Sequence, residues 1–189
     1  MFKKIAILLF ISLSLQGFAQ EVSVEKSIFD VQLGLVGLWA NHELKLTKQL
    51  ALRSEIGLEL GFAEQTSNGV KSTYSVLAPN ITLEPKWYYN LEKRFAKGKN
   101  IKRNSGNFIA IKAHYLPDLF LITGNKNLNI VNQLAIIPQW GIRRVSGKHI
   151  SFETGFGLGP QLYFGKGSKN VTNRDDVYVD LNLRVGYSF

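Results

Sequence analysis

The sequence contains no cysteine. Its fold therefore cannot depend on disulfide bonds or on metal ions held by thiolates, even in an oxidising compartment. Beyond residue 20 it also lacks any uncharged, continuously apolar run approaching the ~20 residues that a membrane-spanning helix needs. The chain beyond that point is therefore either soluble or crosses a membrane as β-strands.

The first twenty residues have the pattern of an export signal. Lys3 and Lys4 give a basic start, residues 5–15 are mostly apolar, and Gly17-Phe18-Ala19 supplies small residues before a cleavage site. We expect residues 1–19 to be a signal peptide and residues 20–189 to form one domain. An uncleaved anchor is the weaker alternative, because the apolar stretch is too short to cross ~30 Å of hydrocarbon as a helix.

The chain is basic. Its 23 Lys and Arg against 14 Asp and Glu give a net charge of +9, and loss of Lys3 and Lys4 leaves 21 − 14 = +7. Such an excess favours anionic partners. Because an export signal precedes the domain, we expect anionic lipids or envelope polymers as partners, and no nucleic acid.

Apolar and polar residues alternate along most of the chain, as in β-strands with two different faces. The last segment is the clearest, since all seven positions of one face are apolar: Val177, Val179, Leu181, Leu183, Val185, Tyr187 and Phe189. Similar segments predict strands at 28–36, 39–46, 51–62, 77–91, 107–116, 132–142 and 150–164. Ranges 63–73, 117–131 and 165–175 are expected to be outer loops, and 47–50, 92–106 and 145–148 periplasmic turns.

Two of these strands share a motif near the same end. Pro85 and Trp87 match Pro138 and Trp140, with an aliphatic residue two positions before each proline. A Trp at that place suits the aromatic girdle at a membrane interface, since the ring is apolar and its N–H can stay hydrated. Each Pro removes a ladder hydrogen bond and suggests a bulge or bend.

Alternation alone does not exclude a soluble exported β-sandwich, whose apolar faces would be buried between two sheets. The chain end, Leu183-Arg184-Val185-Gly186-Tyr187-Ser188-Phe189, resembles the carboxy-terminal signature of outer-membrane β-barrel proteins, in which a final aromatic closes the last strand. Tyr187 and Phe189 would carry this signature, which the barrel-assembly machinery recognises. The basic turn from Asn90 to Ser105 and the strand pattern also resemble the small outer-membrane β-barrel proteins of Bacteroidetes.

The resemblance implies an all-β, eight-stranded antiparallel transmembrane β-barrel in a Gram-negative outer membrane, without implying an activity. An interior of eight strands is filled by side chains. The inward positions hold seven acids and six bases, namely Asp30, Glu43, Glu55, Glu59, Glu84, Glu153 and Asp180 with Lys45, Arg53, Lys86, Lys112, Arg143 and Arg184. Such near-balance predicts a closed, charge-paired interior, because an unpaired charge there is unfavourable.

We therefore expect a monomer with a structural or partner-binding role, without catalysis and without a cofactor. A narrow solute channel is one alternative and a lipid-modifying enzyme is another. His149, Ser151 and Glu153 share a strand face, but alternate strand residues lie ~6.6 Å apart, beyond hydrogen-bond reach. We expect His149 and His114 to belong to the interior polar network, and His42, His114 and His149 have no metal-binding spacing.

The expected turn at 92–106 is unusually long and basic. Six bases crowd within eleven residues with only Glu92 to offset them: Lys93, Arg94, Lys97, Lys99, Lys102 and Arg103. They could contact anionic phospholipid headgroups or a periplasmic partner. The interpretation that we favour is a solvated, flexible turn whose charges only keep it in water.

Overall fold

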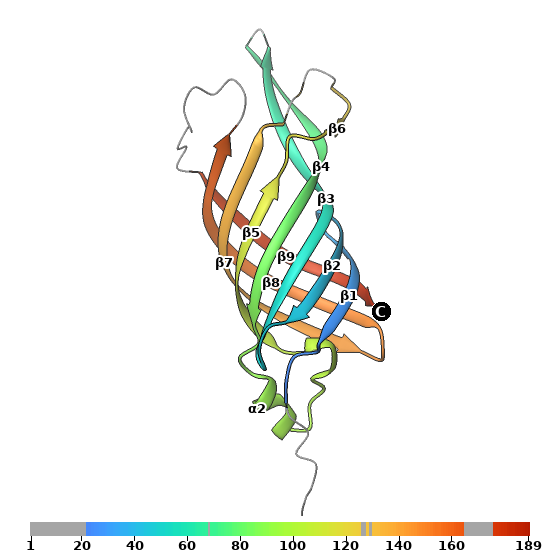
Figure 1. Ribbon diagram of the computed structural model, residues 1–189. Coiled ribbons are helices and arrows are strands. Elements are labelled where there is room, and N and C mark those ends of the chain that lie inside the picture. The colour runs from blue at the N-terminus through green and yellow to red at the C-terminus, as the bar shows by residue number, and fades with distance from the viewer. Residues whose placement is uncertain (1–21, 68, 126–127, 129, 165–175) are drawn as a thin grey trace, which may run out of the picture.

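The chain is all-β. The computed structural model describes residues 22–67, 69–125, 128, 130–164 and 176–189, which form one antiparallel sheet of nine strands (Figure 1). Eight of these strands form a closed ring, because β3 pairs with β4 and β1 pairs with β9. The segments expected as a signal peptide (1–19) and as an outer loop (165–175) lie outside the described residues.

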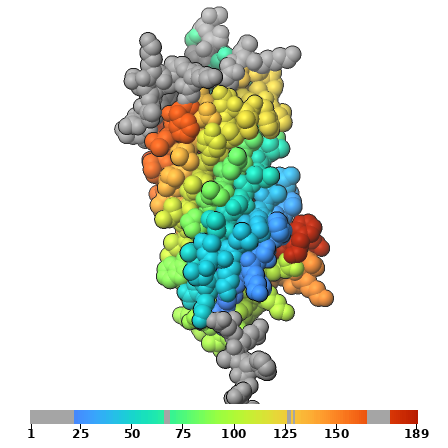
Figure 2. Space-filling view, in the orientation of Figure 1, coloured from blue at the N-terminus to red at the C-terminus, as the bar shows by residue number. Residues whose placement is uncertain are grey.

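The ring follows the chain order. It consists of β1 Ser27–Gly34, β2 Gly37–Lys45, β3 Leu50–Ser67, β4 Val70–Trp87, β5 Asn107–Leu116, β7 Asn132–Ser146, β8 Ile150–Phe164 and β9 Val177–Ser188. The short β6 Ile122–Thr123 pairs with β4 outside this ring. In the space-filling view the strands cover the wall as adjoining slanted bands of colour (Figure 2).

The hairpin of β3 and β4 is longer than the sequence pattern predicts. Range 63–73, expected to be a loop, continues both strands, and their pairing runs to Ser67 opposite Val70. The expectation was wrong because this part of the hairpin carries Glu64, Lys71 and other polar residues, so it lacks an apolar face. Range 117–131 was likewise expected to be a loop, yet it contains β6.

The faces of the strands have the orientation that the alternation predicts. Charged and polar side chains are buried inside the ring, as Arg53, Glu84 and Arg143 show, whereas large apolar side chains such as Ile56 and Leu181 are exposed on the outside. This is the reverse of a water-soluble protein, in which apolar residues dominate the buried core.

One end of the ring is closed by a folded cap. It comprises α2 Leu91–Ala96 and the 3₁₀ helix Lys102–Asn104, and Figure 1 shows α2 beyond the strand ends. A small apolar core lies beneath the cap and includes Val24, Ala51, Tyr88, Leu91, Phe108 and Ala110. The segment expected to be a turn at 92–106 therefore contains helical structure, and Leu91 of α2 belongs to this core. In the described part of the chain, no helix has the length and apolar composition needed to cross a membrane.

Candidate functional site

A buried ion-pair cluster occupies the ring interior near the cap. Arg53 on β3 donates Nε and Nη2 to Glu43 Oε1 at 2.9 and 2.6 Å. It also donates Nη1 and Nη2 to the two carboxylate oxygens of Glu153 on β8 at 2.8 and 2.6 Å. These charges lie almost completely out of solvent, so each is stable there only with its partners.

Two further bases complete the cluster. Lys86 Nζ lies 3.0 Å from Glu153 Oε1 and 3.7 Å from the centre of the Phe108 ring. Arg143 donates Nη2 to the two carboxylate oxygens of Asp30 at 2.9 and 2.7 Å. Three bases from three strands therefore neutralise carboxylates from opposite walls of the ring and connect those walls.

The cap continues this network. Asn104 donates its amide to Glu43 Oε2 at 2.8 Å and accepts a hydrogen bond from the backbone N–H of Glu25 at 2.8 Å. The Tyr88 hydroxyl lies 3.1–3.2 Å from both Glu43 oxygens. Burial, with the nearby Glu43 carboxylate, raises the pKa of Tyr88 well above its usual value, so Tyr88 remains a donor.

A second polar cluster lies farther from the cap. Arg184 pairs with Glu55 at 2.5 Å, and Lys112 pairs with Asp180. Glu59 accepts hydrogen bonds from the Tyr178 hydroxyl at 2.8 Å and the Asn80 amide at 2.9 Å. His114 Nε2 lies 3.2 Å from Glu59 Oε2.

The structure brings together most of the charges that the alternation assigns to the inward face. All nine residues expected in the interior charge network lie inside the ring: Glu55, Glu59, Glu84, Lys86, Lys112, Arg143, Glu153, Asp180 and Arg184. Asp30, Glu43 and Arg53 join them. Lys45 does not, because it is exposed at the end of β2. The inward acids therefore outnumber Lys and Arg by seven to five.

His149, which was expected in the interior network, lies outside it. It belongs to the turn before β8, where strand alternation no longer fixes side-chain direction. Its ring stacks on outward-facing Tyr187 at 4.9 Å, and its Nδ1 lies 2.8 Å from the backbone oxygen of Ser188. His149 is thus outside the interior network, whereas His114 is inside it. No contact joins His149 to Ser151 in the described ranges, so these residues do not form a catalytic pair there.

The basic residues of the cap divide into two groups. Arg103 donates Nη1 to the backbone oxygen of Phe189 at 2.5 Å, and Arg94 donates Nη2 to that of Asn100 at 2.9 Å. The lysines are exposed, namely Lys93, Lys97, Lys99 and Lys102. Sequence reasoning did not foresee the structural part that Arg103 plays.

Aromatic side chains cover the outside of the ring at the cap end. Trp87 and Trp140 face outward with 47% and 46% of their surface exposed, and Ile109 lies between them in the strand register. The Trp140 N–H donates to the Tyr89 hydroxyl at 2.9 Å. The terminal Phe189 is also exposed and packs edge-on against Tyr187, with 5.0 Å between ring centres.

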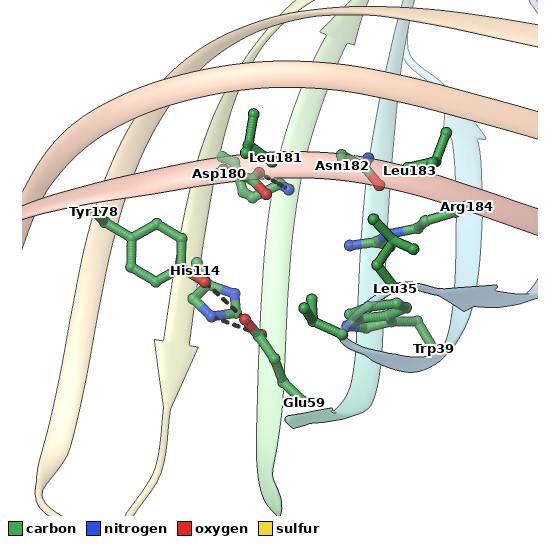
Figure 3. A pocket seen from close by; sticks show the side chains of 12 residues that line it. Leu35, Trp39, Glu59, His114, Tyr178, Asp180, Leu181, Asn182, Leu183 and Arg184 are labelled. Carbon is green, nitrogen blue, oxygen red and sulfur yellow. Dashed lines mark hydrogen bonds and ion pairs between the residues drawn. The ribbon is translucent and has the colours of Figure 1, made fainter. Parts of the chain in front are cut away.

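Two neighbouring hollows lie at the second polar cluster and just beyond it. The smaller one, shown in Figure 3, has a volume of about 20 Å³, and Trp39, Glu59, His114, Tyr178 and Asn182 are among its lining residues. The larger one, of about 290 Å³, shares Glu59 and Tyr178 with it. We call the larger hollow the vestibule.

The vestibule is mainly apolar. Its inward-facing lining residues include Ala63, Val76, Ala78 and Leu116. These residues were not foreseen as part of a site, because a small apolar side chain on an inward face gives no distinct signal in a sequence. The smaller hollow, with its polar lining residues, therefore lies beside a mainly apolar one, and both border Glu59 and Tyr178.

Within the ranges that the structure describes, no group of three or more His, Asp or Glu side chains is arranged to hold a metal ion. Comparison of the chain with protein-family models, with curated proteins and with solved structures found no match.

Proposed function

We propose that this protein is a transmembrane β-barrel of a Gram-negative outer membrane, exported with removal of residues 1–19. In this proposal the eight-stranded ring is the barrel, and its role is structural or ligand-binding. The part of the interior next to the cap is closed and charge-paired, and the barrel acts as a monomer.

The uncharged outer wall carries the proposal. The outward-facing positions of the described strands hold no Asp, Glu, Lys or Arg over 29–33, 38–44, 52–62, 73–87, 109–115, 134–142, 150–164 and 177–187. Most of these positions hold large apolar side chains, which are exposed around the whole ring. Water disfavours so large an apolar surface, whereas the hydrocarbon core of a membrane favours it.

The same residues argue against the alternative of a soluble β-sandwich. A sandwich places apolar faces between two sheets. Here the single sheet closes on itself, its enclosed face carries buried ions such as Arg53 and Glu153, and its apolar face is the exposed one. The described chain offers no second sheet to cover that face.

The ends of the wall fit the two membrane interfaces. Trp87 and Trp140 lie near the cap end, where an interfacial girdle is expected. At the opposite end the outward charges Glu64 and Lys71 lie 3.7 Å apart and are both exposed. We therefore place the cap in the periplasm and the β3–β4 hairpin at the cell surface.

The filled interior favours a structural or binding role over a narrow channel. Arg53, Lys86 and Arg143 are fully buried and cross-linked to carboxylates, and the cap bonds to the same network. Ion flow would require these pairs to separate, and each separation would leave a buried charge unpaired.

Two partners follow from this placement. The exposed lysines of the cap, among them Lys93 and Lys97, lie at the end of the ring that carries Trp87, where they can contact anionic phospholipid headgroups. The exposed aromatic end of the chain, Tyr187 and Phe189, is available to the barrel-assembly machinery during biogenesis.

Fractionation tests the proposal. After expression with its signal peptide in a Gram-negative host, the protein should sediment with outer membranes and remain in the pellet through alkaline carbonate and high salt. Release into the supernatant without detergent would overturn the membrane location.

A further inference from the structure

The wall of the ring is shorter at the hairpin of β1 and β2 than at the flanking strands β9 and β3. Pairing of β1 with β9 ends at Gly34 opposite Arg184, and pairing of β2 with β3 ends at Gly37 opposite Glu59. One further backbone hydrogen bond joins Leu60 N–H to the Val36 oxygen at 2.7 Å. Beyond this level, residues 177–183 of β9 and 61–67 of β3 each have one edge without a neighbouring strand in the described part of the chain.

The bare edge of β9 and the beginning of the bare edge of β3, at residues 61–62, lie within the uncharged wall. Val179 and Leu181 on β9 and Phe62 on β3 face outward there, and each is more than half exposed, at 55%, 68% and 74%. Backbone groups without partners are strongly disfavoured in hydrocarbon. Such edges are tolerated at membrane depth only where they line a polar or hydrated space.

The smaller hollow provides such a space. Its lining includes the consecutive residues 180–184 of β9 together with Leu35 and Val36 of the β1–β2 turn. Alternate residues of a strand face opposite sides, so a hollow can touch five consecutive residues only along a bare edge. The vestibule likewise contacts consecutive residues 59–63 of β3. Both hollows therefore reach the outside of the ring between β3 and β9.

Three buried polar atoms of residues that line the smaller hollow have no hydrogen-bond partner among the described residues. One is His114 Nε2, which lies 3.2 Å from Glu59 Oε2. The other two are the indole nitrogen of Trp39, a donor, and the side-chain oxygen of Asn182, an acceptor. Both residues are more than nine-tenths buried, with 3% and 5% of their surface exposed. Figure 3 shows both beside the hollow, with Trp39 beneath the Arg184 guanidinium.

The neighbouring charges already have partners. Arg184 pairs with Glu55, Lys112 pairs with Asp180, and Glu59 accepts hydrogen bonds from Tyr178 and Asn80. An ion entering the hollow would compete with these pairs, whereas a neutral group with one donor and one acceptor would satisfy Trp39 and Asn182. The volume of about 20 Å³ is enough for one water-sized group, such as a hydroxyl.

The vestibule suits an alkyl chain attached to that hydroxyl. It adjoins the smaller hollow at Glu59 and Tyr178, and its volume of about 290 Å³ is bounded by Ala63, Ala78 and Leu116. An alkyl chain lying there would contact these apolar side chains, and the bare edge of β9 lies toward the proposed membrane.

We propose that this protein binds a single-chain amphiphile with a neutral hydroxyl headgroup, which enters from the membrane through the lateral opening between β3 and β9. The hydroxyl accepts from the Trp39 N–H and donates to the Asn182 oxygen, and the alkyl chain occupies the vestibule. This inference rests on the membrane location proposed above.

Photolabelling tests it. The purified protein, folded in phosphatidylcholine vesicles and checked for folding by its gel mobility without boiling, is irradiated with a long-chain primary alcohol that carries a diazirine in its alkyl chain. The labelled residues are then located by peptide mass spectrometry. We expect inward-facing vestibule residues, Ala63 and Ala78 among them, to be labelled in addition to residues of the outer wall.

Matched variants separate the site from simple partitioning into the bilayer. Ala78→Phe fills the vestibule and should lower inward labelling about tenfold, because overfilling a packed site is unfavourable. Ala113→Phe makes the same change on the outward face of β5 and should leave the inward labelling unchanged. A diazirine fatty acid, which is charged at neutral pH, should label the vestibule less than the alcohol does.

Three results would overturn the inference. These are a folded protein labelled only on outward-facing residues, equal inward labelling of the two phenylalanine variants, and stronger inward labelling by the fatty acid. A protein that stays soluble without detergent would instead contradict the membrane location, so the two failures are distinguishable.

Discussion

Arg53 and Glu153, one hundred residues apart in the chain, meet inside the ring through two hydrogen bonds of 2.8 and 2.6 Å. They come from β3 and β8, which are not neighbours in the ring. The pair therefore spans the interior and connects walls that share no backbone hydrogen bonds. Because Arg53 also binds Glu43, one guanidinium holds three strands together.

Replacing Arg53 with Met should strongly destabilise the ring. Glu43 and Glu153 would lose their shared partner while remaining buried, and breaking such a pair costs about 3–5 kcal/mol. Urea unfolding in phospholipid vesicles, followed by tryptophan fluorescence, measures this. Lys71→Met, which breaks the exposed pair with Glu64, is the control and should cost less than about 1 kcal/mol. An equal loss of unfolding free energy in the two variants would contradict a structural role for the ion-pair cluster.

The cap should loosen when Asn104 becomes Ala. The change removes a buried hydrogen bond to the Glu43 carboxylate and a part-buried one from the Glu25 N–H, and the loss should be about 1–3 kcal/mol. Chymotrypsin should then cut faster at the exposed Phe95 in α2. Lys102→Ala alters an exposed side chain of the same 3₁₀ helix and should leave cleavage unchanged. Unchanged cleavage of the Asn104 variant would mean that the cap is held by other contacts.

Gly57 leaves room for Trp39. A methyl group at this position would lie 2.7 Å from the Leu38 backbone oxygen and still closer to the Trp39 ring. Gly57→Ala should therefore displace the indole and destabilise the fold by about 1–3 kcal/mol. In a Trp87→Phe, Trp140→Phe background, Trp39 emission reports the displacement directly.

Gly61→Ala on the same strand is the control for Gly57→Ala. A methyl group there meets only Val76, at 3.4 Å, so stability and Trp39 emission should hardly change. Identical behaviour of the two variants would show that the indole is not packed against Gly57.

A charge in the middle of the outer wall should oppose membrane insertion. Ile81 faces outward on β4 and is 44% exposed, and Arg at such a position costs about 2–4 kcal/mol when it lies at the bilayer midplane. Thr73→Arg changes an outward position of the same strand near Lys71 and should cost about 0–1 kcal/mol. The measurement is the folded fraction in vesicles over a urea series. If Ile81→Arg were as well tolerated as Thr73→Arg, the wall would not face lipid.

Alternation predicts the ring strands well where one face is apolar. From Val177 to Phe189 all seven alternate positions are apolar, and β9 occupies almost the expected range. The same reasoning fails for residues 63–73, where the hairpin leaves the apolar wall and loses its pattern. The Asn68-Gly69 pair, which favours two-residue hairpin turns, was the available signal for that hairpin. The helix α2 has only six residues, too few for a clear helical period.

The interior charges were predictable because strand parity assigns side chains to faces. Parity fails at strand ends, which explains why Lys45 and His149 lie elsewhere than expected. It also gives no information on pairing across the ring, so the meeting of Arg53 with Glu153 required the structure. The lateral opening depends on the different lengths of β2 and β3, which follow from the register of the whole sheet.

Heat modifiability tests the central claim most directly. The mature chain, extracted from membranes with detergent, is run on a denaturing gel with and without boiling. We predict that the unboiled protein stays folded and migrates differently from the boiled one, because the closed ring resists detergent until it is heated. Full solubility without detergent and a single mobility under both conditions would contradict a membrane barrel.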